Sequence, residues 1–411
     1  MKQIKSYIKT VFIFCSIFFV LKGNAQQLES LIDVALTNNP EIQKFELQYK
    51  RASEQVNEVN NIPNTAFAVG YFVSEPETRT GAQKFKISAN QMLPWFGTIT
   101  SREKYVSSLA EVKYEDIVIT KRKLMSSVSQ SYYNLYANEA KQEVLRKNIK
   151  LLETYETLAL TSVEVGKASA VDVLRLQMRQ NEMQQLKDVL KQQFLAEQTN
   201  FNNLLNRAND VTVNVVDGLT IPSEDFEINS EKLALHPELL KYDKLYLSVE
   251  QSELLNQKES SPMIGFGLDY INVEKRPDMN FSDNGKDILM PMVSLTIPIF
   301  NKKYKSQTKQ NELQEQEILA QKQERLNTLE TILDKAINDR ISSRISYSTQ
   351  SKNLKQAIDA EEIIFKSYET GTIDFNDVLD IQELQLKFQM NQIESVKTYY
   401  VQTTIINYLS N

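Results

Sequence analysis

The sequence predicts a mostly helical α+β fold built from one unit that is used twice. Three observations predict it: two long blocks almost free of glycine and proline, short alternating apolar segments outside those blocks, and landmarks that recur 197 to 205 residues later. Each unit is expected to hold a β-hairpin and a long coiled-coil helical hairpin.

The two long blocks predict helical hairpins. Residues 98–217 contain no proline and one glycine, Gly166, and residues 299–411 contain no proline and one glycine, Gly371. Apolar residues in the first block recur at spacings of four and three, as at Leu145, Ile149 and Leu152, which is typical of coiled-coil packing. Each block therefore predicts a long helix, a turn at the glycine and a returning helix.

Four segments alternate apolar residues with polar or small ones and predict strands. They are residues 65–73, 83–92, 263–272 and 288–297. In the first segment Phe67, Val69 and Tyr71 share one face. Polar loops over 74–82 and 274–287 join the strands of each hairpin. The alternation fits membrane strands with one lipid-facing side and also a soluble antiparallel sheet over a core, and the strands alone do not decide between them.

The repeat predicts how the chain is divided. Asp172-Val173-Leu174 returns as Asp377-Val378-Leu379. We expect a first repeat over 26–207, an equatorial linker over 208–232 and a second repeat over 233–411, each repeat beginning with a short helix.

The linker and the strand count add two expectations. Val211–Val216 predicts a short strand outside the repeat. Four strands cannot close a barrel around a lumen, so strands that cross a membrane would require several copies of the chain to share one barrel.

Residues 1–25 have the layout of a secretory signal peptide. Lysines precede an apolar run over Val11–Leu21, and small residues lie before the expected cut at Gln26. The run is short for a membrane anchor, which is the less favoured alternative. Cys15, the only cysteine, lies inside the run, so neither a lipidated cysteine nor a disulfide is expected. Removal of the signal takes the formal net charge from −6 to −10, because it carries four lysines and no acid.

Composition argues against several classes of function. His236 is the only histidine and precedes a proline at an expected helix start, so we interpret it as structural and expect no metal site and no cofactor. The acidic net charge is unlike that of a nucleic-acid-binding protein. Neither a phosphate-binding glycine loop nor a nucleophile–base arrangement is apparent, which predicts that the chain is not an enzyme. After residue 25 no apolar stretch is long enough for a helical membrane span.

With these features assembled, the sequence resembles the outer-membrane efflux protein (TolC-like) family. The resemblance is carried by Leu31–Ile42, by Gln91–Gly97 and by the glycine turns that follow Val165 and Tyr368. It implies a homotrimer in the outer membrane that extends into the periplasm, with a twelve-stranded β-barrel continuous with an α-helical tunnel. It also implies a passive conduit that docks on a periplasmic adaptor and, through it, on an inner-membrane pump, with the RND type favoured.

The resemblance assigns roles to both helical tips. Tyr368, Asp377 and Asp380 correspond to the periplasmic gate, where three chains would form a ring of six carboxylates that favours cations. Ile373 and Asp374 occupy the position of the family's gating arginine, so the closing contact is altered. The tips that dock on the adaptor correspond to Val165, Gly166, Asp172, Val173, Leu174, Gly371, Thr372, Val378 and Leu379. For Asp172 we favour a helix cap over a docking role.

Trp95 has two compatible interpretations. It is expected to be an aromatic residue at the membrane rim, and its motif Leu93–Gly97 resembles the heavy-metal branch of the family. Two alternative functions also stay open. One is a soluble periplasmic coiled-coil adaptor or scaffold, and the other is a conduit for type I protein secretion.

Overall fold

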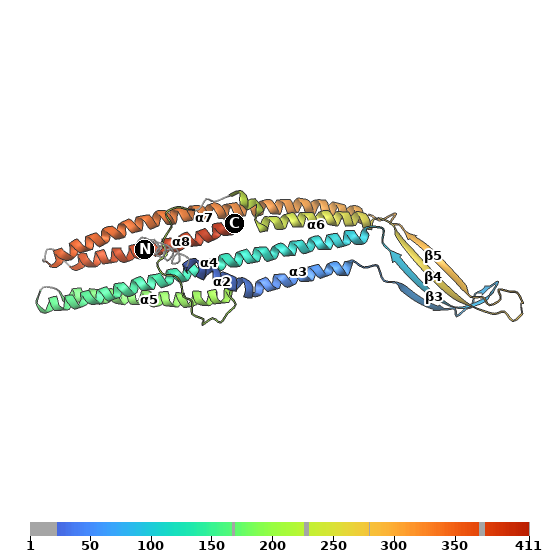
Figure 1. Cartoon of the computed structure of the whole chain (residues 1–411), viewed down its shortest axis with the longest axis horizontal. Helices are drawn as coiled ribbons and strands as arrows, with labels where there is room; N and C mark the ends of the chain where they lie inside the picture. Colours follow the sequence, from blue (N-terminus) through green and yellow to red (C-terminus); the bar gives the residue numbers. More distant parts are fainter. Residues whose placement is uncertain (1–22, 167–168, 226–229, 279, 370–374, 411) are drawn as a thin grey trace, which may run out of the picture. The chain divides into compact units, whose positions relative to one another are not determined.

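The computed structural model describes residues 23–166, 169–225, 230–278, 280–369 and 375–410 (Figure 1). The predicted signal peptide lies outside the described residues except for its last three positions. The first half of the chain forms α2 (Gly23–Asn38), α3 (Pro40–Val59), β1 (Ala66–Tyr71), β2 (Glu77–Thr78), β3 (Gly81–Leu93), α4 (Thr98–Glu164) and α5 (Ala170–Leu204). The second half forms a 3₁₀ helix (Ser230–Leu235), α6 (Pro237–Glu259), β4 (Met263–Glu274), β5 (Ile288–Thr296), α7 (Lys303–Glu369) and α8 (Phe375–Ser410). The predicted fold class is confirmed: a mostly helical α+β chain with repeated β-hairpins and long helical hairpins.

The chain divides into two compact units, and each takes residues from both predicted repeats. The strand unit comprises Lys44–Ile117 and Pro237–Arg325. The helical unit comprises the described parts of Met1–Gln43, Val118–His236 and Leu326–Asn411. The long helices α4 and α7 contribute a segment to each unit.

One antiparallel sheet forms the strand unit's apolar surface. The strands are ordered β1-β3-β4-β5, and the short strand β2, which we did not expect within the polar loop, pairs with β3. The register aligns Val69 with Ile87, Ile87 with Tyr270, and Tyr270 with Leu289. Because side chains alternate between faces, these aligned residues of the four main strands lie on the same face of the sheet, whereas Ile271, which aligns with Lys86, lies on the other.

The two faces of the sheet differ in polarity. On the apolar face Phe67, Val69 and Leu289 are exposed. On the opposite face Lys86 of β3 forms an ion pair with the buried Asp269 of β4, and Ser88 lies opposite Asp269 in the register. The sheet thus presents one apolar exposed side and one side with paired charges.

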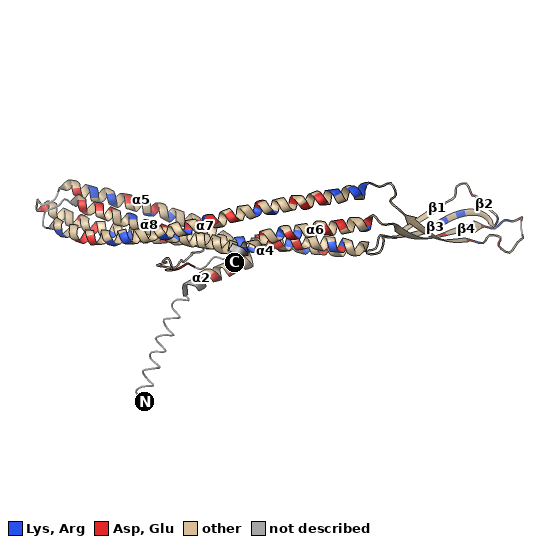
Figure 2. Cartoon of the chain, turned by 90° about the horizontal axis from the view of Figure 1, so that it is seen from above, with Lys and Arg blue, Asp and Glu red and all other residues tan. Residues whose placement is uncertain are grey.

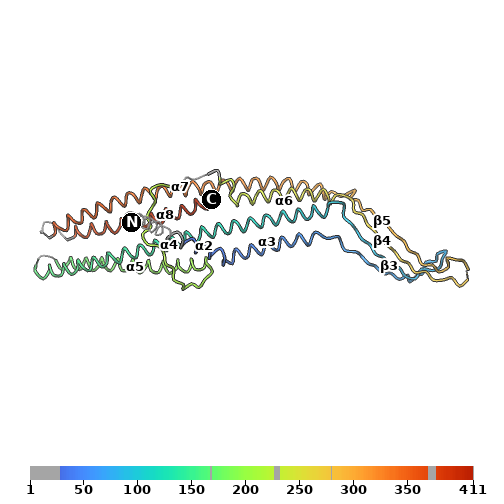
Figure 3. Tube along the Cα trace, viewed as in Figure 1, coloured from blue at the N-terminus to red at the C-terminus, as the bar shows by residue number. Residues whose placement is uncertain are grey.

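The helical unit contains two antiparallel helical hairpins, α4 with α5 and α7 with α8 (Figure 3). The predicted coiled-coil stripe is confirmed, since Leu145 and Leu152 are buried and Ile149 packs against the same core cluster. Leu176 of α5 and Val378 of α8 belong to that cluster too, so it joins the two hairpins. His236, interpreted as structural, is buried and packs edge-to-face on Tyr408.

The prediction of a strand at residues 211–216 is wrong. This segment is extended but pairs with no other strand in the described part of the chain. Val213 and Val216 are buried in the core instead, and their backbone N–H groups donate to the Gln198 side chain at 3.4 Å and to the Tyr132 hydroxyl at 3.1 Å. Side chains of neighbouring helices therefore replace the ladder that a strand would need.

Acidic and basic residues are both distributed along the long helices (Figure 2). None of the helices in the described ranges is both long and apolar enough to cross a membrane.

Candidate functional site

The first helical tip turns at Gly166. Its backbone has φ +72°, a left-handed conformation that glycine adopts without strain, and its N–H donates to the Val163 carbonyl at 3.0 Å. Val165, next to the turn, has 65% of its side-chain surface exposed. A Cβ added at Gly166 would meet no atom within 4 Å, so the glycine serves the backbone conformation and not a close contact.

Asp172 caps the helix that returns from this tip, as we favoured from the sequence. Its carboxylate accepts a hydrogen bond from the Ser169 N–H at 3.2 Å, and the Ser169 hydroxyl accepts one from the Val171 N–H at 3.2 Å. This reciprocal pair is a capping box, which satisfies backbone donors that the first turn leaves free.

The predicted docking residues are divided between core and surface. Val173 and Val378 are buried and Leu379 packs against the same cluster, whereas Leu174 is 57% exposed. Gly371 and Thr372 lie outside the described residues. The apolar surface of the first tip is formed by Val165, Val171, Leu174 and Met178. We had missed Val171 and Met178, although their spacing of three and four from Leu174 marks one helix face.

The gate candidates of the second tip differ in environment. Asp377 and Asp380 are both exposed at the start of α8, and their spacing of three places them on one face. Tyr368, near the end of α7, is partly buried against the core cluster that contains Val378. The described part of this tip therefore combines two exposed carboxylates with one aromatic side chain held by the core.

Two arginines link α5 to α8, and the sequence did not identify them. Arg175 donates a hydrogen bond to the side-chain oxygen of Asn376. Arg179 forms an ion pair with Glu383 at 2.6 Å. Both links lie within the first three turns of α5 and α8, so the two tips are connected by charged and polar contacts as well as by the core.

A buried polar seam joins α4, α7 and α8 at about the level of Glu383. The Glu361 carboxylate of α7 accepts hydrogen bonds from the Tyr155 hydroxyl at 3.0 Å, from the Gln385 amide at 2.7 Å and from the Gln382 amide. Burial is the main cause that raises the pKa of the Tyr155 phenol, and the charge of Glu361 raises it further. The phenol therefore remains a donor at neutral pH. The seam ties α4, α7 and α8 together through one acceptor.

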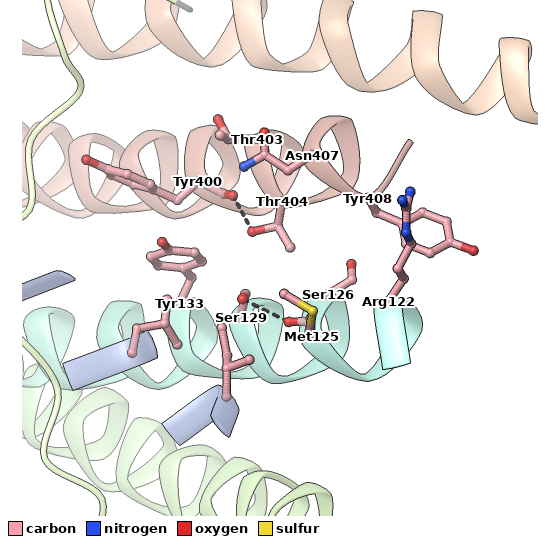
Figure 4. Close-up of a pocket in the computed structure, with 12 residues that line it drawn as sticks. Arg122, Met125, Ser126, Ser129, Tyr133, Tyr400, Thr403, Thr404, Asn407 and Tyr408 are labelled. Carbon is pink, nitrogen blue, oxygen red and sulfur yellow. Dashed lines mark hydrogen bonds between the residues drawn. The ribbon is translucent and has the colours of Figure 1, made fainter. Parts of the chain in front are cut away.

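A cavity of about 450 Å³ lies between α2, α4 and α8 in the helical unit (Figure 4). Two of its hydroxyl groups are used within their own helices: Ser129 donates to the Met125 carbonyl at 2.9 Å and Thr404 to the Tyr400 carbonyl at 3.0 Å. The Tyr400 hydroxyl donates to the Thr220 carbonyl of the linker at 2.8 Å. Arg122 is the one ionised side chain in its lining. The lining thus offers no nucleophile with an adjacent base.

Trp95 follows β3 and has 36% of its surface exposed, with its ring packed edge-to-face on Phe96 at a centroid distance of 5.8 Å. Among the described residues no group of three His, Cys, Asp or Glu side chains is arranged to hold a metal ion.

Comparison with known proteins bears on one of the two alternatives, the soluble adaptor. Residues 31–207 match the family described as Outer membrane efflux protein. Over these residues, a little under half of its length, the chain matches this family in sequence. It is a subunit of an outer-membrane efflux channel that extends into the periplasm, and it is not an enzyme. This result excludes the soluble adaptor. Channels of the family form trimers in tripartite efflux systems.

Solved structures agree in fold. CusC, which forms a transmembrane channel, superposes with a TM-score of 0.77 at 14% identity, covering 94% of this chain and 92% of its own. VceC from Vibrio cholerae gives 0.76 at 15% identity, covering 94% and 96%. The MtrE outer membrane channel of Neisseria gonorrhoeae gives 0.73 at 16% identity, covering 93% and 88%. No protein in a curated set matches the chain.

Proposed function

We propose that three copies of this chain form one passive conduit, which receives substrates from an inner-membrane pump of the RND type through a periplasmic adaptor. The observation that carries the proposal is the open sheet. Within the described residues β1 pairs only with β3, and β5 only with β4. Unpaired edges and an exposed apolar face are both unfavourable in a single chain in water. Pairing of β1 with β5 of another copy would satisfy both edges and close a twelve-stranded barrel.

The polarity of the sheet supports a membrane position for this assembly. Phe67, Val69, Leu289 and Val293 would face lipid, and the ion pair between Lys86 and Asp269 would face the lumen. The apolar residues then gain the apolar surroundings that they lack in one chain.

The gate in this proposal is formed by Asp377 and Asp380, with Tyr368 behind them. Three copies would bring six carboxylates to one constriction, which would attract cations and repel anions. Both carboxylates are exposed in the single chain, and neither is neutralised by a salt bridge in its described part.

The docking surface in this proposal is the outer face of the two tips. Val165, Val171, Leu174 and Met178 are apolar residues that the described part of the chain leaves exposed, which suits contact with an adaptor helix. Val173, Val378 and Leu379 support this surface from the core, and Gly371 and Thr372 would complete the second tip.

Within this function, the motif Leu93–Gly97 favours export of heavy-metal ions. Deletion of the gene should then lower tolerance to copper or zinc salts, with unchanged tolerance to hydrophobic dyes. The reverse pattern of sensitivity would assign the conduit to another substrate class, while leaving the channel itself intact.

Single-channel conductance in a planar bilayer tests the gate. The purified protein should give cation-selective channels that a trivalent cation blocks from the tip side. D377N/D380N should abolish the block, because it removes the carboxylates, whereas D188N/D359N removes two exposed carboxylates elsewhere on α5 and α7 and should leave the block unchanged. Persistence of the block in D377N/D380N would show that other residues line the constriction.

A further inference from the structure

The two repeats differ sharply just after their matching aromatic residues. Phe96 and Phe300 correspond, and the first repeat continues with Thr98, Ile99 and Ser101. The second repeat has Lys302, Lys303 and Lys305 at these positions. Since α4 begins at the first set and α7 at the second, the fold itself does not require lysines here.

These lysines are unfavourable for the helix on which they lie. The start of α7 carries no acidic residue in its first turn, and cations at a helix N-terminus oppose its dipole. The helix is capped by Asn301, whose side-chain oxygen accepts from the Lys303 N–H at 2.9 Å, so capping does not explain the charges. All three lysine side chains are exposed and form no salt bridge with any described residue. They are therefore available to an anionic partner.

A fourth lysine lies at the same end of the strand unit. Lys258 is in the last turn of α6, where it is exposed. That end of α6 contacts both long helices: the Asn256 amide donates to the Tyr304 carbonyl at 2.9 Å, and Glu259 forms an ion pair with Arg102 at 2.9 Å. We call Lys258, Lys302, Lys303 and Lys305 the basic collar.

An exposed apolar group adjoins the basic collar. Phe96, Ile299 and Phe300 are 79%, 72% and 98% exposed, and Trp95 lies beside Phe96. The sheet register places the ends of β3, β4 and β5 together at this edge, since Leu93 aligns with Ile264 and Met263 with Thr296. Aromatic residues followed by lysines are the arrangement found where a protein passes from hydrocarbon to headgroups.

We propose that the basic collar binds the headgroups of anionic phospholipids in the periplasmic leaflet of the outer membrane, with the adjoining aromatic residues in the acyl region. Charge complementarity carries this assignment, because each lysine near an anionic surface attracts it and no carboxylate of the described residues pairs with these lysines. Lys303 also lies over the Tyr304 ring at 5.6 Å, a contact that leaves its charge uncompensated. The inference rests on the proposed placement of the strands in the membrane.

Trp95, the only tryptophan, provides a probe beside the collar. The protein is reconstituted in vesicles of equal parts phosphatidylglycerol and phosphatidylcholine, with brominated chains on one lipid or on the other. Bromine quenches tryptophan fluorescence at contact. The two samples therefore differ only in which of the two lipids lowers the fluorescence when it touches Trp95. Quenching should be stronger with brominated phosphatidylglycerol, which would correspond to an association with Trp95 about five times that of phosphatidylcholine. This preference for phosphatidylglycerol should vanish at about 1 M salt, where screening of the charges is nearly complete.

K302T/K305S introduces the residues of the first repeat and should bring the preference close to unity. K275Q/K286Q is the control, because it removes two exposed lysines from the loop at the other end of β4 and β5. This variant should retain the preference for phosphatidylglycerol. Equal quenching by both lipids in the wild type would overturn the proposed binding of anionic headgroups by the basic collar, but it would still be consistent with strands that lie in the membrane. Absence of quenching by either lipid would show that Trp95 does not contact lipid, and would overturn the membrane placement itself. The same result is expected if the collar binds an acidic protein instead.

Discussion

Arg175 of α5 and Asn376 of α8 are joined by a hydrogen bond between the guanidinium and the side-chain amide oxygen. The same guanidinium lies 3.9 Å from Asp172 on its own helix. In the repeat, Asp172 corresponds to Asp377 and Arg175 to Asp380. The first returning helix thus begins with an acid and a base and the second with two acids, so the carboxylate of Asp380 has no equivalent in the first tip.

R175Q should loosen the connection between the two tips. The glutamine is too short to reach Asn376 and carries no charge, so the second tip would be held by the core and by Arg179 alone. We expect more frequent openings in planar bilayers, by up to about tenfold if one charge-assisted hydrogen bond is lost. R146Q is the control, because Arg146 pairs with Glu143 on its own helix. Equal opening frequencies in both variants would assign tip closure to other contacts.

Asp225 holds the linker against α7 and α8. Arg344 donates to it at 2.5 Å, and so does the Tyr399 hydroxyl at 2.5 Å. Burial opposes ionisation of Asp225, but these hydrogen bonds and the charges of Arg340 and Arg344 outweigh it and hold its pKa below the ordinary 3.8. Burial, and then Asp225, raises the pKa of Tyr399 to about 12. The carboxylate is thus ionised and the phenol protonated at neutral pH.

D225N should destabilise the helical unit at pH 7 by about 1–3 kcal/mol, because it removes the charge that these donors stabilise. A depressed carboxyl pKa contributes stability above the unfolded value of 3.8, and this is lost as pH falls through the lower folded value. The difference between D225N and wild type in urea unfolding should therefore shrink below about pH 4. D210N alters an exposed linker acid and should match wild type. A difference that is constant with pH would show that the charge of Asp225 is not the cause.

The regular elements were predictable because their signals are local. Period-two alternation marked the strands, and the single glycine of the first helical block, Gly166, marked its turn. The spacing of Leu145 and Leu152 identified the core stripe for the same reason. These features need only the chemistry of neighbouring residues.

The contacts between distant segments were not predictable in this way. The linker looked like a strand because valines suit strands, yet the Tyr132 hydroxyl and the Gln198 side chain bind its backbone. Likewise the link from Arg175 to Asn376 spans 201 residues, and no local pattern selects that partner. Such contacts depend on which helix faces meet, which one sequence read locally does not specify.

E361Q should destabilise the helical unit although it conserves shape. Glu361 accepts from three donors, and a glutamine would direct its own amide hydrogens at one or more of them. We expect a loss of about 1–3 kcal/mol in the free energy of unfolding, the cost of leaving a buried donor unpaired. E362Q is the matched control, because Glu362 pairs with Lys366 on the exposed face of the same helix and should change stability by less than about 0.5 kcal/mol. Equal effects would mean that the seam contributes no more than a surface pair.

Two glycines of the sheet should respond in opposite ways to alanine. Gly81, at the start of β3, has φ +134°, and a Cβ there would lie 1.8 Å from the backbone oxygen of Glu274 on β4. Backbone cannot move aside as a flexible side chain can, so G81A must distort the pairing of β3 with β4. We expect a loss of more than about 2 kcal/mol, measured by thermal unfolding and by the yield recovered from outer membranes.

Gly70 of β1 supplies the control for that experiment. A Cβ at Gly70 would meet nothing within 4 Å in the single chain, so G70A should be neutral or slightly stabilising through reduced freedom of the unfolded chain. If G70A lowered the yield as strongly as G81A, the added Cβ would have to clash with atoms that are absent from the single chain and present in the assembled channel. Since β1 is an edge strand, the filling atoms would come from another copy, and the same result would support closure of the sheet between chains.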